Sequence, residues 1–486
     1  MIRFAVSFLI LVASTVAVSF SCPTAKITQT TIGGNLPVGT TVPVLVPANT
    51  NCTITFDIPK GFVLKIGLSA DFQSTNDTVQ VVDNLGVVRT LQHTGVPINN
   101  ALIYVSASFA QIRVASMSGK SSFMATYLYQ SLSGYTQVTR KTGEFIALSS
   151  VVGTTYYSFT SAKNDRIVAT VGQRNTQSTD YVLNQIYVYD GANLTTANMI
   201  GRLDSLGTSI SPSSGSAYSL VNFYGYRSTS YLLANDYSAV QNLNKYTVIV
   251  TSLGSTTNGQ VMDLSNNGAS YTFICTDCSK FYLTQFTFDS LKTVANKGYV
   301  TFQGQTPTHG RNKLIRYDAM TYTSKQLPQL IPTNIFTMGL YVSGINLMTS
   351  TVNDDTEWKR PYDGRKGFIF SPNLWDSTTT NYNYEFRNDS QLFKYQLNFD
   401  AAKFASVDSL SLKIGTTSSG TPAVNNLYPR DTSSTGVVSS NGNYMQLGFN
   451  GSVSSDVRLS FTMTQVSTAS AIRLLVPIFL AFFRLL

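Results

Sequence analysis

The chain has few of the residues that usually perform acid–base or metal chemistry. Its two histidines are His93, in LQHTG, and His309, in PTHGR, and neither lies in a metal-ligand spacing such as HExxH. Both stand in turn-like surroundings, where a solvated loop histidine is the common explanation. The sequence also lacks the GxSxG, GxGxxG and P-loop strings of many enzymes. We therefore expect a protein that binds without catalysing a reaction and that needs no organic cofactor.

The four cysteines are expected to form two disulfide bonds if the chain is exported. Four thiols allow three pairings. Cys275 and Cys278 stand close enough in FICTDCSKF to bridge a tight loop, which leaves Cys22 to pair with Cys52. The CTDC string would suggest thiol redox chemistry in a cytosolic βαβ context, and two such pairs could hold zinc. Because the sequence has neither that context nor a second CxxC, we expect structural disulfides.

The first residues have the order of a secretory signal peptide. Arg3 supplies the positive start, residues 4–12 form a largely apolar run, and Ser19 and Ser21 are the small residues expected near a cleavage site. The apolar run is too short for a bilayer core, which needs about 20 helical residues. We expect residues 1–21 to be removed and the mature chain to be extracellular.

The last residues, 468–486, are typical of a glycosylphosphatidylinositol (GPI) attachment signal. Small residues precede an apolar tail that runs from Leu474 to the end of the chain, in the order that such signals use. Arg484 interrupts the tail, and the spacer is shorter than the usual length of about eight to twelve residues. The open alternatives are an intact membrane-associated tail or simple secretion. The candidate attachment residues are Ser467, Ala469 and Ser470. Attachment there would place the protein on the outer leaflet of the plasma membrane, in ordered, raft-like regions.

Five N-x-S/T sequons mark candidate glycosylation sites for an exported chain. They are Asn51, Asn76, Asn193, Asn388 and Asn450. Asn51 is the least expected of them, because its middle residue is Cys52, which should lie in a disulfide. The formal net charge is +9, but no run of Lys or Arg accompanies it. The sequence therefore does not predict nucleic-acid binding.

Short alternating strings dominate the rest of the chain and predict β-strands. Examples are TYYSF, DRIVATV, KYTVIV and DVRLSF, which are bounded by Gly, Asn, Asp and Ser. Stretches with helical periodicity are scarce. A chain of this length is too long for one sandwich core, so we expect several all-β modules.

One strand-and-turn string recurs at domain-sized spacing. DTVQVVD begins at Asp77, NQIYVYDG at Asn184 and DSLSLKIG at Asp408, with apolar residues in the same phase. Further alternating strands follow each string, such as FMATY after the first and YMQLGF after the third. The recurrence predicts tandem modules of related fold.

At these strings the chain resembles the CUB domain, a β-sandwich module, and its first part is similar to the nematode CUB-like domain family. The matching features are Cys22, PANTNC (Pro47–Cys52), IPKG (Ile58–Gly61), DTVQVVD, FMATY and, in the last module, GFIFSPN (Gly367–Asn373). The fold that this resemblance implies is a row of tandem CUB-like β-sandwich modules.

Four modules are expected between the terminal signals. They are a CUB-like domain at 22–130, a second CUB-like β-sandwich at 131–254, a β-rich module at 255–359 and a further CUB-like β-sandwich at 360–465. The third rests on size and strand content alone, because no family string was found in it.

Many CUB modules bind calcium, and the resemblance implies a candidate site in the last module. Its ligands would be Asp400 in LNFDAAKF, Asp408, and Asp456 in SSDVRL, with carbonyls and water completing the shell. The first of these positions is usually Glu in the family, and Asp has a shorter reach. In the first module Asp77 matches, but the later loop SMSGK offers no carboxylate. Surface aspartates without a metal are the open alternative.

Three functions fit these observations. The first is an extracellular recognition glycoprotein that binds a protein or glycan partner, which the resemblance places in innate responses to microbes. The second is a structural glycoprotein of the cell-surface coat, in which the modules act as spacers. The third is a glycan hydrolase whose carboxylates the fold would bring together.

Overall fold

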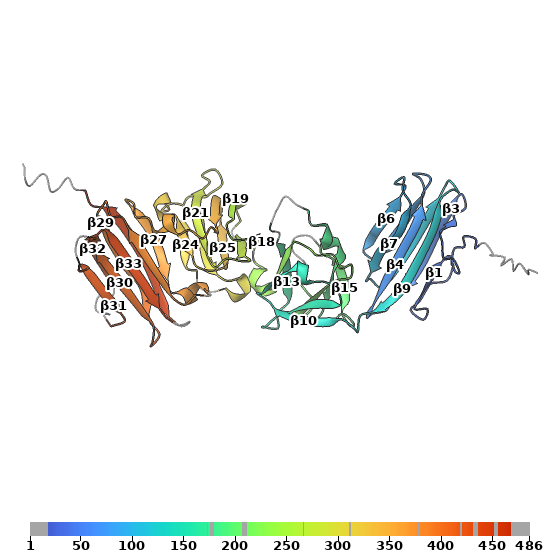
Figure 1. The fold of residues 1–486 in the computed structure, drawn as a ribbon, viewed down its shortest axis with the longest axis horizontal. Coiled ribbons are helices and arrows are strands. Elements are labelled where there is room, and N and C mark those ends of the chain that lie inside the picture. Colours follow the sequence, from blue (N-terminus) through green and yellow to red (C-terminus); the bar gives the residue numbers. More distant parts are fainter. Residues whose placement is uncertain are drawn as a thin grey trace, which may run out of the picture.

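The computed structural model describes residues 18–467, apart from short internal gaps. The gaps are residues 173, 175–178, 207–210, 266, 311–312, 378, 418–419, 431–435 and 452–454. The described residues fold almost entirely as β-strands, in four modules that follow one another along an extended row (Figure 1). The expected all-β fold is therefore confirmed. The expected GPI signal, and the expected signal peptide up to residue 17, lie outside the described residues.

The first module is a sandwich of two antiparallel sheets around one core. One sheet has the order β3 (Thr50–Asp57), β8 (Phe109–Ser116), β5 (Thr78–Asp83) and β6 (Gly86–Gln92). The other has the order β1 (Gly33–Leu36), β9 (Ser122–Ser131), β4 (Phe62–Asp71) and β7 (Ile98–Val105), and β2 (Val44–Leu45) also pairs with β9. Alternation of apolar and polar residues directs one face of each strand into this core. In strand β3, for example, Cys52, Ile54 and Phe56 are buried, whereas the threonines between them are not.

The second module also has two sheets. One has the order β10 (Thr136–Lys141), β12 (Thr155–Thr160), β16 (Ala217–Asn222), β14 (Ile186–Asp190) and β15 (Asn198–Arg202), in which β10 and β12 are parallel. The other has the order β11 (Phe145–Ala147), β17 (Tyr231–Asp236) and β13 (Ile167–Gly172). The short helices are η1 (Leu148–Ser150), η2 (Tyr181–Gln185) and α1 (Tyr237–Val240), the last of which follows β17 directly.

The third module begins earlier than the sequence predicts. Strand β18 (Lys245–Thr251) was expected in the second module, but it pairs in parallel with β20 (Ala269–Cys275) of the third. Its sheet continues with β25 (Ile335–Tyr341), β22 (Tyr299–Gly304) and β23 (Ile315–Asp318). The facing sheet has the order β19 (Thr256–Asp263), β26 (Ser343–Ser350), β21 (Phe281–Phe288) and β24 (Gln329–Ile331), and the short helices are η3 (Pro307–His309) and η4 (Ser324–Gln326). Strand β18 thus joins the sheet that follows the boundary expected at residue 254, because alternation identifies a strand but not its partner.

The fourth module is a sandwich of two four-stranded antiparallel sheets. One has the order β27 (Arg365–Phe370), β34 (Asp456–Gln465), β29 (Phe393–Lys403) and β32 (Val437–Gly442). The other has the order β28 (Tyr382–Arg387), β33 (Tyr444–Asn450), β30 (Ser409–Gly415) and β31 (Val424–Tyr428). Helix α2 (Thr356–Lys359) precedes β27, and η5 (Pro372–Trp375) follows it.

The last two modules share parts of their cores. Phe370 and Trp375 of the fourth module are buried in the core of the third. In return, Tyr282 and Leu330 of the third module belong to the core cluster of the fourth. Burial of such side chains stabilises the contact, so the two modules pack as one unit rather than as beads on a linker.

None of the helices in the described part of the chain has the length and apolar character needed to cross a bilayer.

Candidate functional site

Strand β14, part of the recurring NQIYVYDG string, is buried on both faces. Ile186 and Val188 point into the core of the second module. Tyr187 and Tyr189 lie on the opposite face, in a cluster that also contains Tyr104 of the first module. Because neighbouring residues of a strand point to opposite faces, one short string provides both a module core and a junction with the preceding module.

Tyrosine hydroxyl groups hold this junction together. Tyr187 donates a hydrogen bond to the carbonyl oxygen of Tyr104, and the backbone amide of Tyr104 donates to the hydroxyl of Tyr224 at 2.9 Å. The hydroxyls of Tyr189 and Ser106 are also hydrogen-bonded to each other. Burial raises the pKa of Tyr187 and of Tyr189, so both hydroxyls are protonated at physiological pH and able to donate.

An ion pair crosses the same junction. Arg202 of β15 lies 3.8 Å from Asp83 at the end of β5, and the Asp83 side chain is only 1% exposed. Burial raises the pKa of Asp83, whereas a hydrogen bond from the amide of Leu85 and the charge of Arg202 act in the opposite direction. An uncompensated buried charge would be costly, so the pair favours this arrangement of the two modules.

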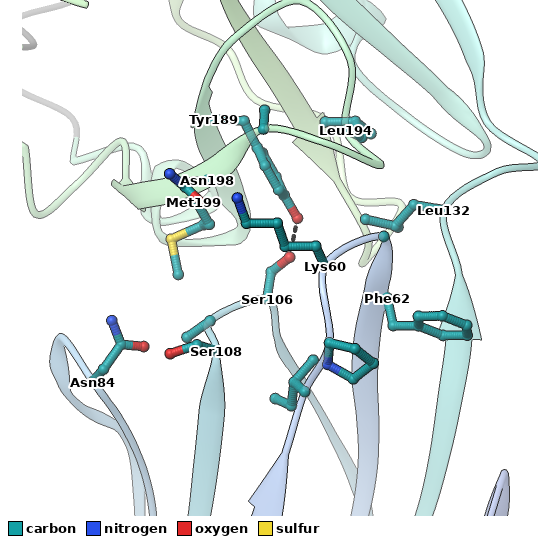
Figure 2. Close-up of a pocket in the computed structure, with 15 residues that line it drawn as sticks. Lys60, Phe62, Asn84, Ser106, Ser108, Leu132, Tyr189, Leu194, Asn198 and Met199 are labelled. Carbon is teal, nitrogen blue, oxygen red and sulfur yellow. Dashed lines mark hydrogen bonds between the residues drawn. The ribbon is translucent and has the colours of Figure 1, made fainter. Parts of the chain in front are cut away.

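A cavity of about 280 Å³ opens at the junction, beside the hydrogen-bonded Ser106 and Tyr189 (Figure 2). Its walls come from both modules: from turns that precede β4, β6 and β8 in the first, and from the segment that leads into β15 in the second. The polar side chains that line it are those of Lys60, Asn84, Ser106, Ser108, Tyr189 and Asn198. Its apolar lining includes Phe62, Leu132, Leu194 and Met199.

Lys60 is the one charged residue among the fifteen that line this junction cavity. Figure 2 shows its side chain among residues of both modules, with Asn84 and Ser108 on the wall that the first module provides. An ammonium group surrounded by hydroxyl and amide donors suits a carboxylate or phosphate, because charge-assisted hydrogen bonds are the strong ones. The lining can therefore bind an anionic group without a competing acidic side chain.

The junction cavity lacks the partners that nucleophilic catalysis needs. No histidine, aspartate or glutamate lines it, and the hydroxyl of Ser106 is bonded to Tyr189 rather than to a base. A serine is a weak nucleophile unless a neighbouring base activates it. The arrangement is suited to binding.

The three aspartates expected to bind calcium have separate protein partners. The buried Asp408 accepts a hydrogen bond from the hydroxyl of Ser455. Asp456 pairs with Arg458 at 2.8 Å, and Asp400 accepts a hydrogen bond from a serine of β34 at 3.3 Å. The described residues contain no group of three or more His, Cys, Asp or Glu that could hold a metal. Calcium binding by Asp400, Asp408 and Asp456 stays a prediction.

Asp77 occupies the matching position in the first module, and protein donors surround it there. Its buried carboxylate accepts hydrogen bonds from the backbone amides of Met117, at 2.7 Å, and Ser118, at 3.1 Å. The hydroxyls of Ser118 and Ser121 also donate to it. Burial by itself raises the pKa of Asp77, but these hydrogen bonds outweigh it and lower the pKa to about 2. The loop SMSGK thus provides hydrogen-bond donors to Asp77 at the place where a calcium site would have a second carboxylate.

The disulfide bonds join the cysteines that the sequence pairs. Cys22 is bonded to Cys52 of β3, and Cys275 at the end of β20 is bonded to Cys278. The first bridge ties the start of the described chain to the first module. The second closes the short loop between β20 and β21.

The expected modification sites lie mostly at the surface. Asn51, Asn76, Asn193 and Asn450 are exposed, and Asn388 is half-buried. Ser467 is exposed at the end of the described residues, whereas Ala469 and Ser470 lie outside them. Glycosylation and lipid attachment at these residues stay predictions.

The junction cavity was not predicted from the sequence, although one of the motifs noted there contributes a residue to it. Lys60 lies in IPKG, which served only as a mark of the family resemblance. Asn198 comes from a different module, and no spacing in the sequence connects it with Lys60. The available signal was the pair of tyrosines in NQIYVYDG. Two large aromatic side chains on the outer face of a strand indicate that this face packs against another part of the protein.

Comparisons with known proteins agree with the resemblance for the first module. Residues 17–133 match the family model described as CUB-like domain. The chain therefore contains a CUB-like domain in its N-terminal part, followed by further β-sandwich modules. No curated protein matches the sequence.

Several solved structures are similar over long stretches at low identity. The CUB1-EGF-CUB2 domains of rat MASP-1 are 12% identical, with 43% of this chain and 99% of that chain covered and a TM-score of 0.19. The full extracellular region of zebrafish Gpr126/Adgrg6 is 9% identical, with 93% and 53% covered and a TM-score of 0.20. A triple jelly roll from an archaeal virus is 10% identical, with 86% and 82% covered and a TM-score of 0.16. These TM-scores are too low to support conclusions about function.

Proposed function

We propose that this protein is an extracellular recognition glycoprotein that binds a ligand bearing a carboxylate or phosphate group in the junction cavity, without turning it over. The observation that carries the proposal is the position of Lys60, a lone cation among hydroxyl and amide side chains from two modules. Ligand sites often lie between domains, with a few convergent polar groups in a partly apolar wall. A microbial surface polymer or an acidic host glycan has the required chemistry.

The residues that line two cavities support the proposed lack of turnover. The junction cavity has no carboxylate or histidine, and a cavity beside the Cys275–Cys278 bridge has one acidic residue, Asp277. Glycoside hydrolysis generally needs two facing carboxylates. Neither cavity provides such a pair, so binding fits better than hydrolysis.

The extracellular setting agrees with the CUB-like domain and the two disulfide bonds. We place the protein on the outer leaflet through a GPI anchor at Ser467, Ala469 or Ser470, as the C-terminal sequence predicts. Treatment of expressing cells with a phosphatidylinositol-specific phospholipase should then release it. Retention of the protein, with its apolar tail still detectable, would contradict the anchor.

A structural role in the cell-surface coat is the second candidate. The observation that favours it is the extended row of modules with buried junctions, which suits a spacer (Figure 1). A spacer needs no ligand, so the two functions differ in whether the purified protein binds anything specifically.

The experiment applies the full chain to an array of acidic glycans, neutral glycans, phosphate-bearing bacterial polymers and extracellular host proteins. The recognition function predicts saturable binding to acidic members and an unchanged ligand mass after long incubation. A protein that binds no member of the array would support the coat function. Reproducible cleavage of a bound glycan would show a hydrolase.

A further inference from the structure

The facing sheet of the third module exposes several amide and hydroxyl side chains on one surface. Along β19, Asn258 and Gln260 are exposed, and along β21, Gln285 and Thr287 are exposed. Asn346 of β26, the strand between them, is exposed as well. Residues two apart in a strand point to the same face, so these side chains share one surface.

The strand register aligns these side chains in two rows. Gln260, Asn346 and Thr287 are neighbours across the three strands. Asn258, Met348 and Gln285 form the next row, with the half-buried Met348 in the middle. Within a row the strands are about 4.8 Å apart, and the rows are about 7 Å apart. These six residues line a shallow hollow of about 490 Å³, and we call this surface the amide platform.

The polar groups of the amide platform are largely unused by the fold. Gln260 donates a hydrogen bond to Asp289 at 3.2 Å. Within the described residues, the side chains of Asn258, Gln285, Thr287 and Asn346 have no hydrogen-bond partner. Each amide offers both a donor and an acceptor, so the surface presents a regular set of free groups of both kinds.

The amide platform is backed by the core of the third module. Phe286 and Leu347 lie between the platform residues in sequence and point to the other face, into the core of the third module. They anchor the strands from below, which fixes the spacing of the amides above them. Ordering such groups in advance lowers the entropy cost of binding.

The platform lining carries no charge. None of its members is Lys, Arg, Asp or Glu, and nearby Asp289 is paired with Lys292 at 3.5 Å. An anionic or cationic ligand would therefore find no opposite charge there. Hydroxyl groups of a sugar, each a donor and an acceptor, match the free amides, and the thioether of Met348 provides apolar contact for a ring face.

We propose that the amide platform is a second binding site, which takes a neutral glycan chain lying across β19, β26 and β21. The site rests on the proposed recognition function but is distinct from the junction cavity, whose lysine calls for an acidic ligand. The open, shallow shape suits a stretch of polymer rather than a small molecule enclosed on all sides.

The test uses the full chain and an array of neutral glucans, mannans and N-acetylglucosamine chains, with sialylated and uronic-acid chains as the charged arm. The double variant Gln285→Ala with Asn346→Ala removes two free amides from exposed positions. The matched control is Asn425→Ala, which changes an exposed strand asparagine in the fourth module.

The double variant should lose at least about tenfold in affinity for neutral chains, because it removes two or more hydrogen bonds to the ligand. The control should bind as the wild type does, and both variants should keep the unfolding temperature and the binding of charged chains. Equal neutral-chain binding by the double variant would overturn the site. Absence of neutral binding with acidic binding intact would overturn this site alone, whereas absence of both would overturn the proposed function as well.

Discussion

At the scale of single residues, protein donors hold the buried carboxylate of Asp77. Asp77 accepts hydrogen bonds from two backbone amides and two serine hydroxyls. Hydrogen bonds to the charged form favour it and lower its pKa even in a buried position. The loop that follows β8 is therefore tied to the start of β5 through one carboxylate.

Replacing Asp77 with asparagine should destabilise the first module by about 2 kcal/mol at neutral pH. The amide nitrogen of asparagine would face donors that need an acceptor. The pKa of Asp77 is lower in the folded protein, about 2, than its ordinary value of 3.8. The stabilisation is thus complete above pH 4 or so and is lost as the pH falls through about 2.

Hydrogen–deuterium exchange across a urea titration of the full chain measures this effect within one module. Amides of Met117 and Ser118 should exchange faster in Asp77→Asn. The control Asp71→Asn, at the end of β4, should leave them unchanged. Equal protection in both variants at neutral pH would contradict the role assigned to Asp77.

At the scale of elements, much of the fold could be predicted from alternation. The strings DTVQVVD, NQIYVYDG and DSLSLKIG contain β5, β14 and β30, as expected. Alternation could not show which sheet β18 joins, because partner choice depends on surfaces far away in sequence. The disulfide pairing could be inferred because the chain has only four cysteines and two of them, Cys275 and Cys278, are three residues apart. The calcium ligands were expected by resemblance alone, and the contacts of Asp408 with Ser455 and of Asp456 with Arg458 leave no signal in the sequence.

The junction cavity and the amide platform could not be predicted for a related reason. Lys60 meets Asn198 only because Tyr187 and Tyr189 dock against the first module. The platform amides stand on three strands whose register no short motif specifies. In each case the residue types are ordinary, and the arrangement alone makes a site.

Arg365, at the start of β27, fastens the third module to the fourth. Its buried guanidinium donates to the carbonyl oxygens of Leu327, at 2.8 Å, and Pro328, at 3.0 Å, in the third module. It also donates to the carbonyl oxygen of Trp358 at 2.7 Å. Burial lowers the pKa of Arg365, and contact with Tyr362 acts in the opposite direction.

Replacing Arg365 with methionine should cost about 3 kcal/mol, because the carbonyl groups of Pro328 and Trp358 lose a charged donor and that of Leu327 keeps only the hydroxyl of Tyr362. Arg365→Lys should recover little of this, since one ammonium cannot match the planar fork of a guanidinium. Thermal unfolding of the full chain provides the measurement, with Arg387→Met as the control. Arg387 forms an exposed pair with Glu385, which contributes roughly 0–1 kcal/mol. Equal losses from Arg365→Met and the control would refute the fastening role.

At the scale of the whole molecule, neighbouring modules of the row are joined through buried side chains (Figure 1). The first two modules share a tyrosine cluster and an ion pair, and the last two share core residues. The junction cavity lies in the first pair and the amide platform in the second. Buried contacts at these two junctions join the modules within each pair.

The central claim, that Lys60 binds the acidic group of a ligand, is tested by the affinity of Lys60→Gln for the acidic chains that the full wild-type chain captures. The control, Lys120→Gln, removes the same charge at an exposed loop beyond the far end of β8. Loss of a charge-assisted hydrogen bond predicts an affinity about ten- to a hundredfold weaker for Lys60→Gln, and wild-type affinity for the control. Unchanged affinity in Lys60→Gln, or an equal loss in both variants, would contradict the claim.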